Sequence, residues 1–381
     1  MSKKKKKAKE EPLNKKRNVK LIAQSVVAVV LVAGVSFTAF KILTGTKHIE
    51  HQDRGGNIAS VTETQQETLP FQFVYEQHSN EDIYDGDLIL VNNSTEYKAQ
   101  GKENLVSIYD EKNSLHPESE NGDTAFGVTD SSLSLRKNAA DNLTAMLDAF
   151  YAATGKDDVV VCSGYRTKEG QQALYDDDLE KTGLDYSERV ALPGYSEHEA
   201  GYSVDLTLAE AEYDGTGDYN WINENCSDYG FILRYPEDKT DITQIEYESW
   251  HYRYVGVPHA EYIMESGMCL EEYIDMLKNS YEVSSDKTSV LEYTAKDGKI
   301  YDIYYVKADT SSDSTYVPFP SGYDYSISGN NTDGFVIWFD TGKTGTHTSL
   351  KDVSQSTESS ETSASENSET ETVAAETSEN N

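Results

Sequence analysis

The chain has 381 residues, a hydrophobic share of 37% and a formal net charge of −34. Its length allows about two domains of ordinary size, and the low apolar share indicates that part of the chain does not join a packed core. Because a polyanion is repelled by nucleic acid, the charge excludes nucleic acid as a partner for the bulk of the protein.

The N-terminal part predicts a membrane anchor. Residues 1–20 are rich in lysine, and residues 21–40 form an uncharged, mostly apolar stretch. About twenty such residues cross a hydrocarbon core as a helix, and the positive-inside rule places residues 1–20 in the cytoplasm. A cleaved signal peptide is the alternative, because Ala33–Ser36 retains a possible cleavage site. With the polar residues 41–70 as a stalk, the prediction is a single-pass protein of the cell membrane whose larger part is extracellular.

Residues 71–280 are expected to form a small α+β domain. Helical spacing of apolar residues predicts helices over 131–154, 167–179 and 221–226. Short apolar or alternating runs predict strands at 71–75, 88–91, 159–162, 204–207 and 231–233. Because the helices and strands do not alternate strictly, the expected sheet is antiparallel.

Two further segments follow this domain. Residues 281–349 are rich in Tyr, Thr, Ser and Asp with alternating patterns, which predicts a small β-rich module; a partner-binding role for it has no motif in support. Residues 350–381 are dominated by Ser, Thr, Glu and Asn and predict a disordered acidic tail. The three cysteines form no CxxC pair, so each is interpreted as a buried small residue, with a Cys226–Cys269 disulfide left open for an extracellular domain.

Two short stretches, 196–205 and 248–251, carry the residue types of a hydrolytic metal site. A catalytic zinc ion needs three protein ligands, such as histidine and carboxylate, and a nearby carboxylate that accepts a proton from water. The candidate ligands are His198, Asp205 and His251. Glu248 precedes His251 by three residues and is the candidate general base.

Two neighbours of these residues have expected structural roles. Gly201 is expected to form the turn that brings His198 and Asp205 together. Trp250 lies between Glu248 and His251, so in an extended segment it is expected to point away from the metal as a structural wedge.

These stretches resemble the signature of the VanY-type zinc D-alanyl-D-alanine carboxypeptidases. The similarity lies in Ser-x-His-x-x-Gly-x-x-x-Asp and Glu-x-Trp-His, and it extends in the family's order to blocks at 163–171, 192–196, 229–236 and 250–256. It covers roughly residues 88–276, with one departure at Ser203, where relatives usually carry alanine. The resemblance implies an α+β domain that binds one Zn²⁺ per chain.

The resemblance also implies substrate-binding residues. A carboxypeptidase must bind a free terminal carboxylate and stabilise the oxyanion that forms on the attacked carbonyl, and a guanidinium suits both tasks. Arg166 is therefore a candidate for catalysis and for substrate binding, and a structural salt bridge is its alternative role. The uncharged groups expected beside it in the substrate site are Ser163, Gln171 and Ser196.

The leading hypothesis is a zinc D,D-carboxypeptidase that removes the terminal D-alanine from peptidoglycan stem peptides outside the membrane. Two alternatives stay open: an L,D-carboxypeptidase that acts on tetrapeptide stems, and a non-catalytic peptidoglycan-binding module with a structural zinc. The expected partners are stem peptides and, through the N-terminal helix, the membrane. The sequence leaves the oligomeric state open.

Overall fold

The computed structural model describes residue 69 and residues 71–350, except for 100, 102, 116–124 and 188. The described residues all belong to one compact unit. None of the helices in these described ranges is long and apolar enough to cross a membrane. The predicted basic segment, membrane span, nearly all of the stalk and the acidic tail lie outside the described residues.

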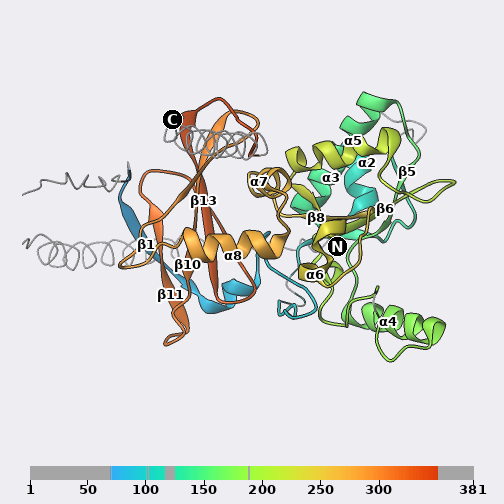
Figure 1. Cartoon of the computed structure of the whole chain (residues 1–381), viewed down its shortest axis with the longest axis horizontal. Helices are drawn as coiled ribbons and strands as arrows, with labels where there is room; N and C mark the ends of the chain where they lie inside the picture. Colours follow the sequence, from blue (N-terminus) through green and yellow to red (C-terminus); the bar gives the residue numbers. More distant parts are fainter. Residues whose placement is uncertain are drawn as a thin grey trace, which may run out of the picture. The chain divides into compact units, whose positions relative to one another are not determined.

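Helices and strands are mixed along the described chain (Figure 1), as predicted. The strands are β1 (Phe73–Ser79), β2 (Leu105–Ser107), β3 (Gly127–Val128), β4 (Ser134–Arg136), β5 (Val159–Ser163), β6 (Ser203–Leu208), β7 (Phe231–Leu233), β8 (His251–Tyr254), β9 (Leu291–Thr294), β10 (Lys299–Lys307), β11 (Ser314–Pro320), β12 (Ser326–Gly329) and β13 (Gly334–Thr344). The α-helices are α2 (Ile108–Leu115), α3 (Lys137–Thr154), α4 (Lys168–Thr182), α5 (Asn220–Asn225), α6 (Thr240–Thr243), α7 (His259–Ser266) and α8 (Leu270–Ser280). The 3₁₀ helices are η1 (Asn80–Tyr84), η2 (Glu197–Ala200), η3 (Gly217–Tyr219), η4 (Cys226–Tyr229) and η5 (Glu237–Lys239).

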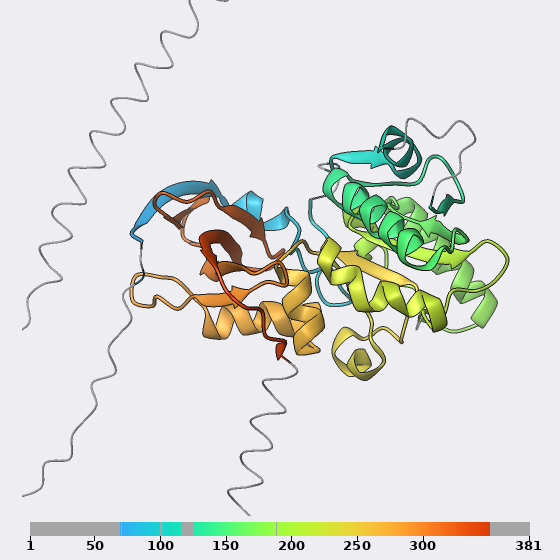
Figure 2. The same ribbon diagram turned by 90° about the horizontal axis from the view of Figure 1, so that it is seen from above.

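A five-stranded sheet in the order β3-β5-β6-β8-β7 is the frame of the larger part of the described chain. The pairs other than β3 with β5 are antiparallel, in agreement with the sequence-based expectation. Helix α3 packs on this sheet because its apolar side chains recur every three or four residues, and Leu143 and Phe150 share a buried core with Val204 (Figure 2). Gly155 ends α3 with a φ of 70°, a conformation that suits glycine.

Two predictions of secondary structure were wrong. The predicted helix over 131–154 begins only at Lys137, because residues 134–136 form β4 and pair with β2. Residues 88–91 form no strand, although Leu88, Ile89 and Val91 are buried. The carbonyl oxygen of Ile89 accepts a hydrogen bond from Arg253 (2.9 Å), and that of Leu90 accepts one from Asn331 (2.8 Å). Side chains from distant residues therefore take the place of a partner strand.

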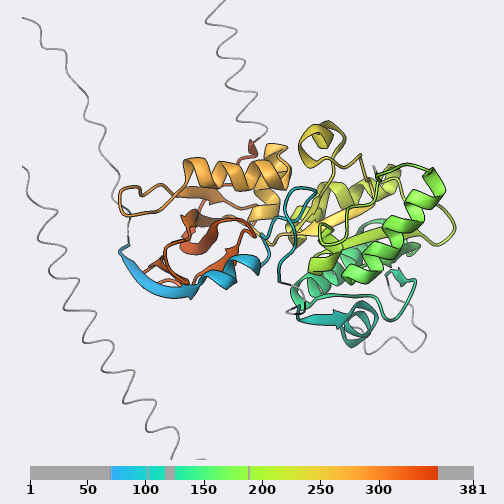
Figure 3. The same cartoon turned by 90° about the horizontal axis from the view of Figure 1, so that it is seen from below.

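The β-rich segment 281–349 packs directly against residues that precede it in the sequence. Strand β1, which the sequence analysis assigned to the 71–280 domain, pairs with β11 over its whole length. Helix α8 lies along β10 (Figure 1 and Figure 3), and Leu277 of α8 shares a buried core with Ile303 of β10. A composition change near residue 280 thus marks no break in the core, since packing joins residues far apart in sequence.

All three cysteines are free. Cys226 and Cys269 are buried, as expected, and they form no disulfide with each other. Cys162 is exposed, contrary to the prediction, because successive side chains of a strand point to opposite faces and those of Val159 and Val161 in β5 are the buried ones.

Candidate active site

Three adjacent strands bring polar residues side by side. Ser163 of β5 is paired with Asp205 of β6, and Asp205 is paired with His251 of β8. Side chains of directly paired residues lie on the same face of a sheet. The predicted residues from three distant parts of the sequence therefore meet on one face.

His198 comes to this face from the 3₁₀ helix η2. Gly201 ends η2 with a φ of 75°, so the chain turns there into β6, which carries Asp205. A hydrogen bond from the backbone nitrogen of Arg166 to the carbonyl oxygen of His198 (3.1 Å) ties the turn to the end of β5. The turn expected at Gly201 is present.

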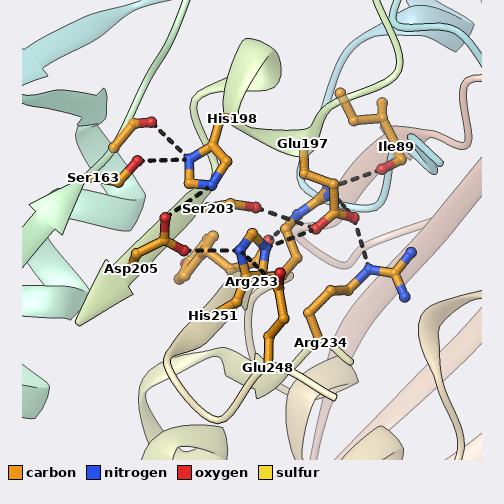
Figure 4. A network of polar contacts seen from close by, with 12 residues as sticks. Ile89, Ser163, Glu197, His198, Ser203, Asp205, Arg234, Glu248, His251 and Arg253 are labelled. Atoms are coloured by element: carbon orange, nitrogen blue, oxygen red, sulfur yellow. Dashed lines mark hydrogen bonds and ion pairs between the residues drawn. The ribbon is translucent and has the colours of Figure 1, made fainter. Parts of the chain in front are cut away.

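The side chains of His198, Asp205 and His251 converge (Figure 4), and their ligand atoms all lie within 4.8 Å of one another. His198 Nε2 is 3.3 Å from Asp205 Oδ2, and His251 Nδ1 is 2.9 Å from Asp205 Oδ1. His198 Nδ1 lies 2.8 Å from the carbonyl oxygen of Gly164, which can only accept a hydrogen bond, so Nδ1 carries the proton. Nε2 of the neutral ring is then free to bind a metal, and burial favours that neutral form by lowering the pKa of His198.

This donor set fits a zinc ion. Two imidazole nitrogens and one carboxylate are a usual set of protein ligands for catalytic zinc. Hydrogen bonding of the second ring nitrogen to a carbonyl or carboxylate is the usual support of a histidine ligand. The chemistry of the three groups and their mutual distances therefore agree with the cofactor that the resemblance implies.

Glu248 lies beside this cluster. Its Oε2 is 3.7 Å from His251 Nδ1. Burial raises the pKa of Glu248 to about 7, although the neighbouring His251 lowers it. A carboxyl group with such a pKa both accepts and releases a proton near neutral pH, as a general base must.

Neutral groups hold Arg166 in place. Its Nη2 donates to Ser163 Oγ (2.9 Å) and its Nη1 donates to Gln171 Oε1 (2.6 Å). Gln171 in turn donates to the carbonyl oxygen of Ala191 (2.7 Å). These two hydrogen-bond partners of Arg166 are therefore uncharged side chains of the described part of the chain. The guanidinium retains its charge for a bound anion.

These residues surround a cavity of about 160 Å³. The predicted site residues that line it are Arg166, Gln171, Ser196, His198, Asp205, Glu248 and His251. Ser163 does not line the cavity; it acts on the site through Arg166. Trp250 also lines the cavity, contrary to the expectation that it points away, and Tyr235 and Arg189 are lining residues that the sequence analysis missed.

The sequence analysis also missed Glu197, which is buried next to the histidine cluster (Figure 4). Its Oε1 accepts hydrogen bonds from Arg234 Nε and Arg253 Nη1, both at 2.8 Å, and its Oε2 is 3.6 Å from His251 Nε2. Burial alone would raise the pKa of Glu197, but the two arginines hold it well below its usual range. Ser203 donates to the same carboxylate (3.2 Å), which gives its hydroxyl a structural role.

A signal for this buried ionic cluster was present in the sequence. Arg234 directly follows the apolar residues of the predicted strand 231–233, and a buried guanidinium requires a partner. The sequence analysis did not identify Glu197 as this partner, because in the stretch 196–205 it considered only His198 and Asp205 as functional acidic or basic residues.

The comparisons with known proteins agree with this site. The family model of the VanY D-alanyl-D-alanine carboxypeptidases matches residues 132–257, a range that holds every predicted site residue. A D-alanyl-D-alanine carboxypeptidase of Enterococcus faecium is 33% identical over 300 residues, which are 78% of this chain and 86% of the relative. The chain belongs to the VanY family.

Two further similar proteins are also named as enzymes that act on D-Ala-D-Ala. The bifunctional D-Ala-D-Ala dipeptidase and carboxypeptidase VanXYC of Enterococcus gallinarum is 43% identical over 135 residues, 33% of this chain and 71% of the relative. The crystal structure of the vancomycin-resistance D,D-dipeptidase VanXYg, with a D-Ala-D-Ala phosphinate analogue, is 30% identical. It has a TM-score of 0.59 and covers 70% of this chain and 99% of its own. The resemblance to the VanY family is therefore confirmed.

Proposed function

We propose that the protein is a zinc-dependent D,D-carboxypeptidase that removes the terminal D-alanine from peptidoglycan stem peptides. One observation carries the proposal: His198, Asp205 and His251 converge on a cavity that Glu248 and Arg166 also line. A non-catalytic module with a structural zinc would need neither the general base nor the unpaired guanidinium. Membership of the VanY family supports the same reaction.

His198, Asp205 and His251 would hold one zinc ion per chain. When bound, zinc supplies Lewis acidity towards water and the scissile carbonyl group. Glu248 takes the proton from the attacking water and returns it to the leaving amine, because its carboxylate lines the same cavity as the three candidate ligands.

The remaining lining residues bind and orient the substrate. Arg166, held by Ser163 and Gln171, donates to the oxyanion and attracts the terminal carboxylate. Ser196 and Gln171 add neutral polar contacts. Apolar side chains close the rest of this small cavity and suit the methyl group of a terminal alanine: Leu174, Val190, Ala191 and Ile245.

The proposed location is the outer face of the cell membrane. Residues 21–40 would anchor the chain as a single helix, with residues 1–20 in the cytoplasm and residues 41–70 as a stalk. This arrangement would hold the active site within reach of the cell wall.

The test uses the purified full chain in detergent and synthetic stem peptides. Metal analysis should give one zinc per chain, and mass spectrometry should show loss of one D-alanine from a pentapeptide. Glu248→Gln should retain zinc and lose about 10²- to 10⁴-fold in rate. The exposed neighbour Glu246 is the matched control, and Glu246→Gln should keep full activity.

Two outcomes would change the proposal. Release of D-alanine from the tetrapeptide but not from the pentapeptide would establish the L,D-carboxypeptidase instead. Unchanged peptides with zinc bound would favour the non-catalytic module.

A further inference from the structure

A buried segment joins the active-site sheet to the β-rich part of the chain. Residues 86–97, which we call the linking segment, form no helix or strand, yet Ile89 and Val91 are completely buried. The carbonyl oxygens of Asp87 and Ile89 accept hydrogen bonds from Arg253 of β8 (3.0 and 2.9 Å). Other groups of the segment bind the turn between β12 and β13. The linking segment thus contacts both parts through its backbone.

We infer that Asn331, in the turn between β12 and β13, is a positioning residue for the candidate zinc ligand His251. The connection runs through the linking segment, Arg253 and Glu197. This inference rests on the proposed zinc-dependent function. It gives the β-rich residues 281–349 a role in the active site, although the residues that line the cavity all precede residue 252.

Asn331 is suited to hold the linking segment. It is completely buried, and its Nδ2 donates to the carbonyl oxygens of Leu90 (2.8 Å) and Glu96 (2.9 Å). Asparagine combines two such donors with tolerance of the left-handed backbone conformation, and φ of Asn331 is 60°. The backbone nitrogen of Leu88 also donates to Ser328 Oγ (2.9 Å), which ties the segment to the end of β12.

The linking segment in turn fixes Arg253 (Figure 4). Nη2 of this arginine donates to the two carbonyl oxygens of the segment, and its Nη1 donates to Glu197 Oε1 (2.8 Å). Because the guanidinium is planar and rigid, a shift of the carbonyl oxygens that hold Nη2 also moves Nη1. Arg253 is completely buried, so a carbonyl contact that it loses is not replaced by bulk water.

Glu197 connects this arrangement to the candidate metal ligand. Its Oε2 is 3.6 Å from His251 Nε2, whereas Asp205 Oδ1 lies 2.9 Å from the other ring nitrogen, Nδ1. A carboxylate that faces the second ring nitrogen of a metal-binding histidine orients the ring, and its loss weakens metal binding by about 10- to 100-fold. Because Arg234 also holds Glu197 (2.8 Å), a change at the linking segment should have a smaller effect.

The test measures zinc affinity rather than turnover. Asn331→Gly removes the amide but allows the same backbone angle. The full chain in detergent, titrated with zinc against a competing chelator, should then bind zinc about three- to tenfold more weakly. The matched control is Gln244→Gly, because Gln244 also has a positive φ, 59°, but is exposed. This control should retain the affinity of the unmodified protein.

A second substitution separates positioning from a general loss of stability. Arg253→Lys keeps a positive charge near Glu197 but loses the planar fork that binds the carbonyl oxygens. Since the connection is then already broken, adding Asn331→Gly should lower the zinc affinity by less than about twofold while it still lowers Tm. The same fold loss in both backgrounds would show that Asn331 acts only on stability and would overturn the inference.

The geometry of the site gives an independent readout. Cobalt(II) in place of zinc absorbs visible light, and its bands depend on the arrangement of the ligands. Asn331→Gly should shift these bands, and Gln244→Gly should leave them in place. Unchanged bands in Asn331→Gly would show that the ligands keep their positions and would overturn the inference.

The outcomes also separate this inference from the proposed function. If Asn331→Gly does not fold, Ser328→Ala decides, because it removes the acceptor of the Leu88 nitrogen and should weaken zinc binding about twofold. Unchanged zinc affinity in the folded variant, with D-alanine still released by the unmodified protein, would overturn only the positioning role. Failure of the unmodified chain to bind zinc would contradict the proposed function and with it this inference.

Discussion

Replacing Glu197 by glutamine should lower the free energy of unfolding more than the same replacement at the nearby Glu199. The side chains of Glu197, Arg234 and Arg253 are each 0% exposed. Without the carboxylate, Arg234 keeps its ion pair with Glu271 (2.6 Å), but Arg253 retains only carbonyl acceptors. Loss of one partner from a buried pair costs about 3–5 kcal/mol, because the other charge stays buried. Since the glutamine oxygen still accepts a hydrogen bond, the low end, about 3 kcal/mol, is expected.

The assay is thermal unfolding of the metal-free protein, followed by circular dichroism. A loss of about 3 kcal/mol corresponds to a fall in Tm of roughly 5 °C for a unit of this size. Glu199 is the matched control, because it is buried on the same turn and accepts a backbone hydrogen bond from Gly194 (2.6 Å). Burial raises the pKa of Glu199, so glutamine should be tolerated there at a cost below about 1 kcal/mol.

A double substitution tests the physical reason. In Glu197→Gln with Arg253→Met, the unpaired buried charge is absent, so the loss of stability should be smaller than the sum of the two single losses by about 1 kcal/mol or more. Additive losses, or a Glu197→Gln variant no less stable than Glu199→Gln, would refute the reasoning.

Three further predictions follow from single positions. Gly201→Val should weaken zinc affinity by about tenfold or more, because φ is 75° and a Cβ would lie 2.9 Å from the side chain of Leu105. In equilibrium zinc titrations, Gly183→Val, with the same backbone strain but nothing within 4 Å, should leave the affinity unchanged. Arg166→Met should lower kcat by about 10²- to 10³-fold with zinc retained, and a normal kcat would exclude its role at the oxyanion. Burial raises the pKa of Asp302 from 3.8 to about 6, so the folded state binds this proton more tightly and loses stability as pH rises through that interval. Asp302→Asn should therefore gain about 1–3 kcal/mol at pH 7.5 and nothing below about pH 4 in urea unfolding, and a gain independent of pH would contradict this assignment.

Much of the local structure could be predicted from the sequence. The spacing of apolar residues indicated α3, which ends at Thr154 as predicted. The helix predicted over 167–179 is α4, and the hydroxyl of Thr167 caps it by accepting a hydrogen bond from the nitrogen of Gly170 (3.1 Å). Strand β7 has the predicted bounds, 231–233. These features depend on residues close in sequence, whose periodicity and turn chemistry are visible without a structure.

The sequence by itself also determined the family and the set of residues that could hold a metal. Motif spacing singled out His198, Asp205, His251 and the general-base candidate Glu248, and the resemblance added Arg166. Their residue types are set by chemistry, because few side chains bind zinc or stabilise an oxyanion.

Only the tertiary structure decided which residues surround that set. The pairing of β1 with β11 and the contacts of Arg253 with both Glu197 and the carbonyl oxygen of Ile89 join residues far apart in sequence. The same holds for Cys162 and Glu212, which line one hollow although they are far apart in sequence. Such neighbours depend on the summed packing of the whole chain, and no local pattern of residues encodes them.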